Sequence, residues 1–167
     1  MKRVMEVIII LLFFLLQSTL FQHIAFAGIV PNLMIIITSG CGYMNGKTDG
    51  MIAGFLSGLL LDIFYGDVIG FNALLFLYIG YANGYANRYF FPDDIKLPLV
   101  FVSLSDVVYL TVTYIVRFLL RARFDIGFYF LNVILPELVY TFIVALLLLM
   151  PIIYLNRRRR VFGKYGE

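Results

Sequence analysis

The sequence predicts an all-α integral membrane protein, a bundle of six helices in which the second is short. Composition and the spacing of apolar runs carry this prediction. The 167 residues are 62% hydrophobic and 14% charged, whereas a soluble domain is usually about 45–50% apolar and about 25% charged. Because a hydrocarbon core about 30 Å thick needs roughly 20 apolar residues per helix, the chain holds about five or six spans and no separate soluble catalytic domain.

The expected helices follow one another along a single polytopic domain, residues 1–167. The predicted spans are about 4–22, 29–44, 49–66, 70–90, 97–120 and 127–155. The basic start of the first resembles a signal peptide, but its apolar stretch continues to Phe21, so we interpret it as a retained helix. Because "SGCGYMNG" follows Thr38, we expect the second helix to be tilted, half-inserted or packed against its neighbours.

Lysine and arginine residues beside the spans predict the orientation. With six crossings, ten basic residues fall on one side: Lys2, Arg3, Lys47, Arg88, Lys96, Arg157, Arg158, Arg159, Arg160 and Lys164. The other side has Arg117, Arg121 and Arg123. We therefore expect both termini in the cytoplasm, and the net charge of +3 reflects membrane topology and not nucleic-acid binding. The "RRRR" run after the last helix is expected to anchor it at the cytoplasmic surface, with a docking site for a cytoplasmic protein as the alternative.

Glycines recur at intervals of four around one aspartate: Gly50, Gly54, Gly58, Asp62, Gly66 and Gly70. Residues four apart share a helix face, and small residues there let another helix approach closely, within this chain or in a partner. An ionised carboxylate in hydrocarbon costs on the order of 3 kcal/mol, so Asp62 must be paired, protonated or hydrated. Our first hypothesis is an ion pair with Arg117, with Arg121 and Arg123 as substitutes, which also explains arginines on the outer side.

Two further acids lie deeper in the predicted spans, Asp106 in "SLSDVVYL" and Glu137 in "VILPELVY". Their positions allow them to meet near the membrane midplane. Pro136 frees a backbone carbonyl and kinks its helix, which makes a polar notch where the carboxyl group of Glu137 can find partners. We expect either a structural polar cluster or a contact with a partner or ligand, since intramembrane acids are functional candidates.

The sequence contains no recognisable set of catalytic or cofactor-binding residues. The serine in "FLSGLL" has no histidine base within the bundle, because the single His23 falls in an expected outer loop. The single Cys41 excludes an internal disulfide and a multi-cysteine metal site. A P-loop, an aspartate pair for magnesium and a zinc-binding helix are also missing. We therefore expect a non-enzymatic protein without a cofactor or bound metal.

Three blocks of the chain resemble the bacterial rod-shape-determining membrane proteins of the MreD family. They are "PNLMIII" (31–37), "GFLSGLLLDIFYGDVIGFNALLFLYIGY" (54–81) and "LPELVYTFIVALLLLMPIIY" (135–154). The middle block is the most specific, with its glycine, aspartate, glycine spacing and Gly-Phe-Asn turn. Asp62 with Gly58 and Gly66, and Pro136 with Glu137, match the family pattern, whereas "GCGYMNGKTDG" (40–50) departs from it.

The resemblance implies a multi-pass component of the bacterial inner membrane that helps direct lateral cell-wall elongation. Its implied partners are membrane lipid, the periplasmic coiled-coil protein MreC, the RodA glycosyltransferase with its class B transpeptidase, and the actin-like MreB filament. The implied fold is similar to the six-helix substrate-binding subunits of energy-coupling-factor vitamin transporters. Two functions therefore stay open, a scaffold that binds partner helices and a solute-binding transport subunit, although the expected outer turns offer few polar groups for a solute.

Overall fold

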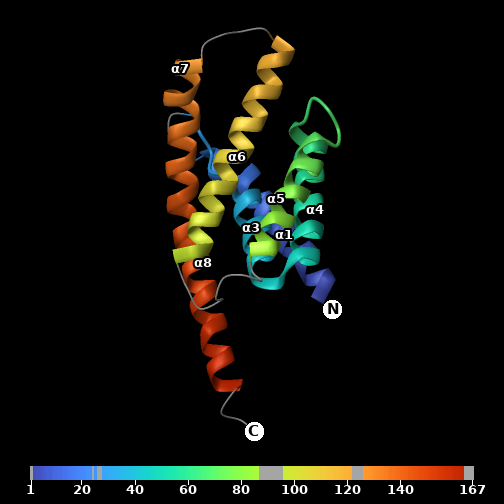
Figure 1. Ribbon diagram of the computed structural model, residues 1–167, viewed down its shortest axis with the longest axis vertical. Coiled ribbons are helices and arrows are strands. Elements are labelled where there is room, and N and C mark those ends of the chain that lie inside the picture. Colours follow the sequence, from blue (N-terminus) through green and yellow to red (C-terminus); the bar gives the residue numbers. More distant parts are fainter. Residues whose placement is uncertain (1, 24, 26–27, 87–95, 122–125, 164–167) are drawn as a thin grey trace.

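The computed structural model describes residues 2–23, 25, 28–86, 96–121 and 126–163, and this part is almost entirely helical (Figure 1). The elements are α1 (Lys2–Ser18), α2 (Leu20–His23), α3 (Leu33–Asn45), α4 (Lys47–Tyr65), α5 (Phe71–Ala86), α6 (Lys96–Arg121), α7 (Ile126–Tyr129), the π-helical turn η1 (Phe130–Ile134) and α8 (Leu135–Gly163). Six of these helices have 13 residues or more, and the second of the six, α3, is the shortest. The prediction of an all-α bundle with a short second helix is confirmed.

Three helical stretches in the described part of the chain are long and apolar enough to cross a membrane. They are Lys47–Tyr65, Lys96–Val116 and Phe130–Met150. The protein is therefore a helical membrane protein, while the crossing of the membrane by all six helices stays a prediction. The start of α1 and the end of α8 lie toward the same end of the molecule, as an even number of crossings requires (Figure 1).

The short helix α3 lies at the centre of the bundle, in contact with α1, α4, α5, α6 and α8. Its side chains from Leu33 to Gly40 are buried on every face. The first N–H groups of α3 have no hydrogen-bond partner within the helix. Because they are buried, they need partners from other residues. Asn32 Oδ1 accepts from the N–H of Ile35 at 3.2 Å, and Gln17 Oε1 of α1 accepts from the N–H of Met34 at 3.2 Å. Of the arrangements open for this helix, the structure shows packing against its neighbours.

Helices α4 and α5 lie side by side (Figure 1) and approach each other backbone to backbone. A Cβ atom added to Gly54 would overlap the carbonyl group of Phe76, and one added to Gly58 would overlap that of Asn72. The contact is reciprocal, because a Cβ atom on Gly80 of α5 would overlap the carbonyl group of Gly50. The glycine face of α4 is therefore closed by α5 of the same chain, and it joins the two helices into one unit.

Helix α6 runs obliquely between α8 on one side and the α4–α5 pair on the other (Figure 1). Its inner face contributes Leu99 and Val102 to a hydrophobic core centred on Phe76 of α5, which is fully buried. α8 adds Ala145 to the same core. The outward faces of α6 and α8 keep large apolar side chains exposed, as expected for surfaces that meet lipid or partner helices.

The last predicted span contains a change of helix type just before its proline. The π-helical turn Phe130–Ile134 leads directly into Leu135 and Pro136, after which α8 is regular. Proline lacks the N–H that would bond the carbonyl four residues earlier, and a π-helical turn is one way in which a helix accommodates such a break. Asn132 Nδ2 donates to the carbonyl of Phe128 at 2.9 Å in this turn.

Candidate functional site

The Asp62 carboxylate accepts four hydrogen bonds from the residues that begin α5. The donors are the N–H groups of Gly70 (2.9 Å), Asn72 (3.0 Å) and Ala73 (2.9 Å), and the side-chain Nδ2 of Asn72 (2.9 Å). The first N–H groups of a helix lack intrahelical partners and carry partial positive charge, so a carboxylate is favoured there. Asp62, which is 1% exposed, therefore caps α5 from the last turn of α4.

These bonds satisfy the carboxylate without a cation, which answers why a chain of this composition holds Asp62 inside the bundle. Arg117 and Arg121 belong to α6, but their side chains lie outside the described residues, as does the whole of Arg123. An ion pair between Asp62 and Arg117 therefore stays a prediction.

The expectation of one glycine face from Gly50 to Gly70 is wrong beyond Gly58, because α4 ends at Tyr65. The N–H of Gly66 donates to the carbonyl of Asp62 at 3.1 Å and closes the helix. Gly70 has a φ of +102°, a left-handed backbone conformation that favours glycine, and this conformation directs its N–H to the Asp62 carboxylate. These two glycines shape the turn around Asp62, and a Cβ atom added to Gly66 would overlap the backbone of Asp62 and not that of another helix.

A second buried polar cluster joins three helices through Asn83 of α5. Its Nδ2 donates to Ser105 Oγ of α6 at 2.8 Å, to Ser39 Oγ of α3 at 3.4 Å and to the carbonyl of Ile79 at 2.8 Å. Ser105 Oγ in turn donates to the carbonyl of Phe101 at 2.7 Å. Within the described part of the chain, Asn83 Oδ1 is buried and has no hydrogen-bond partner. The cluster therefore keeps one acceptor free.

Asp106 is fully buried between α6 and α8, as expected for an intramembrane acid. Neither of its carboxyl oxygens has a partner with hydrogen-bond geometry among the described residues, although the Thr141 side chain lies beside them. Thr141 Oγ1 accepts from the N–H of Asn32 at 3.1 Å and so links α8 to the start of α3. Glu137 precedes Thr141 by one helical turn, so the two side chains lie on the same face of α8. A direct meeting of Asp106 with Glu137 stays a prediction.

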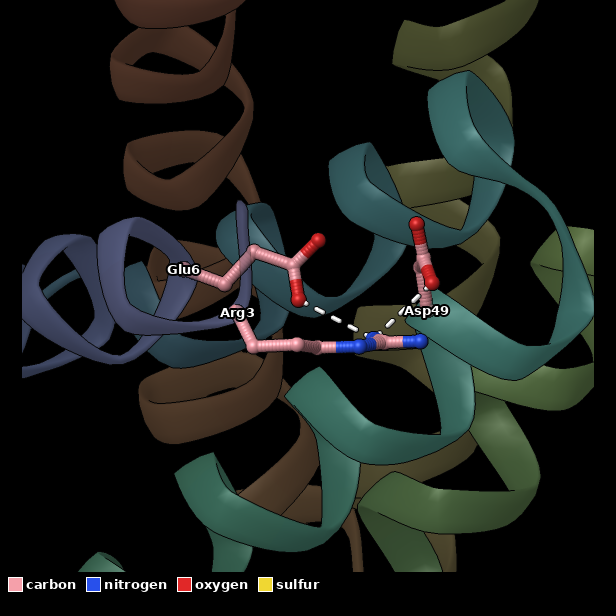
Figure 2. A network of polar contacts seen from close by, with 3 residues as sticks. All are labelled: Arg3, Glu6 and Asp49. Carbon is pink, nitrogen blue, oxygen red and sulfur yellow. Dashed lines mark hydrogen bonds and ion pairs between the residues drawn. The ribbon is translucent and has the colours of Figure 1, made fainter. Parts of the chain in front are cut away.

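At the end of α4 opposite to Asp62, Arg3 of α1 bridges two acids (Figure 2). Its Nη1 lies 3.1 Å from Glu6 Oε2 and 2.9 Å from Asp49 Oδ1 of α4, and both acids are mostly buried. Lys47 Nζ lies 4.4 Å from the ring centroid of Tyr85 on α5, within the range of a cation–π contact. Arg3 and Lys47, which the sequence marked as topology signals, therefore also join α1, α4 and α5.

Several residues that build these contacts were not identified from the sequence: Glu6, Gln17, Asn32, Asn83, Ser105 and Thr141. Each is a polar residue within, or at the start of, a largely apolar helix, and that is the signal that marks such positions as candidates. The basic run that was expected to anchor the last helix belongs to α8, but the side chains of Arg157, Arg158, Arg159 and Arg160 lie outside the described residues. Across the described part of the chain, no three His, Cys, Asp or Glu residues are grouped so that they could hold a metal ion.

A groove of about 310 Å³ opens between α5 and α6. Apolar side chains line most of it, among them Tyr78 on α5 and Leu104 on α6, and both are well exposed. Asn83 and Ser105 also line the groove, so the polar cluster with the free Oδ1 borders this surface. The structure thus brings together an apolar groove and one hydrogen-bond acceptor that has no donor among the described residues.

The tight α4–α5 unit, the capped turn at Asp62 and the exposed apolar faces of the outer helices define a small polytopic helical membrane protein. A family model described as "rod shape-determining protein MreD" matches residues 1–159, nearly the whole chain. The chain belongs to the MreD family, whose members act with other proteins in determining rod cell shape. No curated protein and no solved structure matches the chain.

Proposed function

We propose that this protein is a non-enzymatic membrane scaffold of the cell-wall elongation complex, which maintains rod shape by holding partner proteins together. The MreC-type periplasmic coiled-coil protein is the proposed direct partner, with RodA and its class B transpeptidase and the MreB-type filament as further members. The family match over residues 1–159 is the observation that carries this proposal. The glycine contact between α4 and α5 supports it, because backbone-to-backbone packing gives the bundle a fixed shape to present.

The groove between α5 and α6 is the proposed contact for a helical segment of the MreC-type partner. A lipid acyl chain would fill its apolar part but would leave Asn83 Oδ1 without a donor. A helix with a hydroxyl or amide donor on its contact face would satisfy that oxygen, and interhelical hydrogen bonds of this kind contribute about 0.6–2 kcal/mol in membranes. The chemistry of the groove therefore favours a helix that carries a hydrogen-bond donor over a lipid acyl chain.

Co-purification with a co-expressed MreC-type protein tests this proposal. The tagged wild-type chain should retain the partner in mild detergent, whereas Leu104→Trp, which fills the groove, should reduce its recovery at least tenfold. Leu147→Trp on α8 is the matched control, because Leu147 is 66% exposed and Leu104 57%, and it should retain the partner. Failure of the wild-type chain to retain the partner would contradict the scaffold function. Retention by Leu104→Trp would instead reject the groove as the contact.

We further propose that both termini lie in the cytoplasm and that all six helices cross the inner membrane. The same-end placement of the start of α1 and the end of α8 supports an even number of crossings (Figure 1). Reporter fusions after Gln22, Lys47, Asp67, Asp94, Arg123 and the C-terminus should alternate between outside and inside, and the last should be inside. A periplasmic C-terminus would contradict the count, with α3 as the first candidate for a helix that does not cross, since 13 residues span only about 20 Å.

A further inference from the structure

A small cavity of about 170 Å³ lies between the α4–α5 turn and the second half of α6. Its polar lining residues are Asp67 in the turn, Asn72 at the start of α5 and Thr113 on α6. The volume is below the range of about 300–1,000 Å³ that is typical of sites for drug-sized ligands. The cavity can therefore admit a small chemical group but not a whole cofactor.

Two buried oxygen atoms beside this cavity have no hydrogen-bond partner among the described residues, Asn72 Oδ1 and Thr113 Oγ1. The Nδ2 atom of Asn72 donates to Asp62, which fixes the orientation of the amide and leaves its Oδ1 as a free acceptor. Thr113 is only 8% exposed, although it lines the cavity. Because buried polar groups are normally hydrogen-bonded, two unpartnered oxygens at one cavity indicate that a polar group fills it.

The lining selects the chemistry of that group. Asn72 Oδ1 and the Asp67 carboxylate can only accept hydrogen bonds, and the Thr113 hydroxyl can accept one as well. A primary ammonium group matches this set, since it has three donors, no acceptor and a positive charge opposite Asp67. A phosphate or carboxylate group would bring acceptors against acceptors and a second negative charge. We propose that the cavity binds the primary ammonium group of a phosphatidylethanolamine-type lipid.

The position of the cavity favours a lipid as the source of the ammonium group. It lies where α4 ends and α5 begins, and a membrane protein's helices end at the level of the lipid headgroups. Val68 and Ile69 in the same turn are 60% and 75% exposed, so this turn presents apolar side chains beside the polar cavity. A lipid with its ammonium in the cavity can cover those side chains with its acyl chains.

Native mass spectrometry of the full-length protein in detergent tests the proposal with two lipids. Dioleoyl phosphatidylethanolamine and dioleoyl phosphatidylcholine have the same acyl chains and headgroup charges, but the quaternary ammonium of the second has no N–H donor. The wild-type protein should bind the first at least tenfold more tightly. Thr113→Val and Asp67→Asn should each reduce that preference at least threefold. Thr111→Val is the matched control, because Thr111 is exposed on the other side of α6, and it should keep the preference.

The melting temperature without added lipid separates binding from folding. Thr113→Val removes a hydroxyl that has no partner among the described residues, so its lipid-free melting temperature should equal or exceed that of the wild type. Equal binding of the two lipids, or a preference that neither variant changes, would overturn the proposal. If only the Arg117→Gln variant prefers the phosphatidylethanolamine, and the wild type does not, the proposal would also be overturned. Arg117 of this chain would then be the group that fills the cavity.

Discussion

Gly58→Leu should prevent stable folding of the bundle. A Cβ atom at this position would overlap the backbone of Asn72 and Ala73 in α5, and a backbone cannot move aside as a flexible side chain can. Inserting extra carbon atoms into a packed core typically costs about 1–3 kcal/mol, and we expect a larger cost here because the two helices must separate. The yield of monodisperse protein in detergent should fall at least tenfold relative to the wild type. Gly54→Ala, which adds one methyl group against the Phe76 carbonyl, should give an intermediate loss.

Gly127→Leu is the matched control, because no atom of the described residues lies within 4 Å of a Cβ atom added to Gly127. It should accumulate at the wild-type level with an unchanged melting temperature. Since α5 covers the glycine face of α4, the effect of Gly58→Leu should appear as a folding defect and not as the selective loss of a partner. Normal accumulation of Gly58→Leu with an unchanged melting temperature would contradict the packing that the structure shows.

Asp62→Asn should lower the free energy of unfolding by about 3 kcal/mol or more, since hydrogen bonds to a charged group contribute about 1.5–3 kcal/mol each. The substitution replaces one acceptor oxygen by an NH₂ donor, which then faces N–H groups that are themselves donors. It also removes the negative charge at the start of α5. Chemical denaturation in detergent should show this loss, and Arg117→Gln should cost less because it breaks none of the four bonds that Asp62 accepts. An Asp62→Asn protein as stable as the wild type would contradict the capping function.

The double variant Asp62→Asn/Arg117→Gln tests the predicted ion pair separately. If Arg117 pairs with Asp62, the loss in the double variant should be smaller than the sum of the two single losses, because the cycle isolates the pairwise term. Additive losses would reject the pair and assign the whole effect to the donors from residues 70–73.

The order of the helices could be predicted from the sequence because membrane thickness sets the length of an apolar run. The spacing of Gly50, Gly54 and Gly58 likewise predicted a close-packed face, since residues four apart share one side of a helix whatever surrounds it. The need of Asp62 for a partner also followed from the sequence, because the cost of an unsatisfied charge in hydrocarbon does not depend on the fold. These inferences rest on local geometry or on the properties of the membrane.

The identity of each partner was decided by the tertiary structure. The donors to Asp62 come from Gly70 and from the first turn of α5, and Gly70 adopts a positive φ that the spacing of glycines does not reveal. Asn83 meets Ser39 and Ser105 over separations of 44 and 22 residues, so only the packing of α3, α5 and α6 brings them together. Hydrophobicity alone also cannot tell a helix that faces lipid from one that other helices enclose, because both are apolar all round. The burial of α3 therefore followed from the arrangement of its five neighbours and not from its composition.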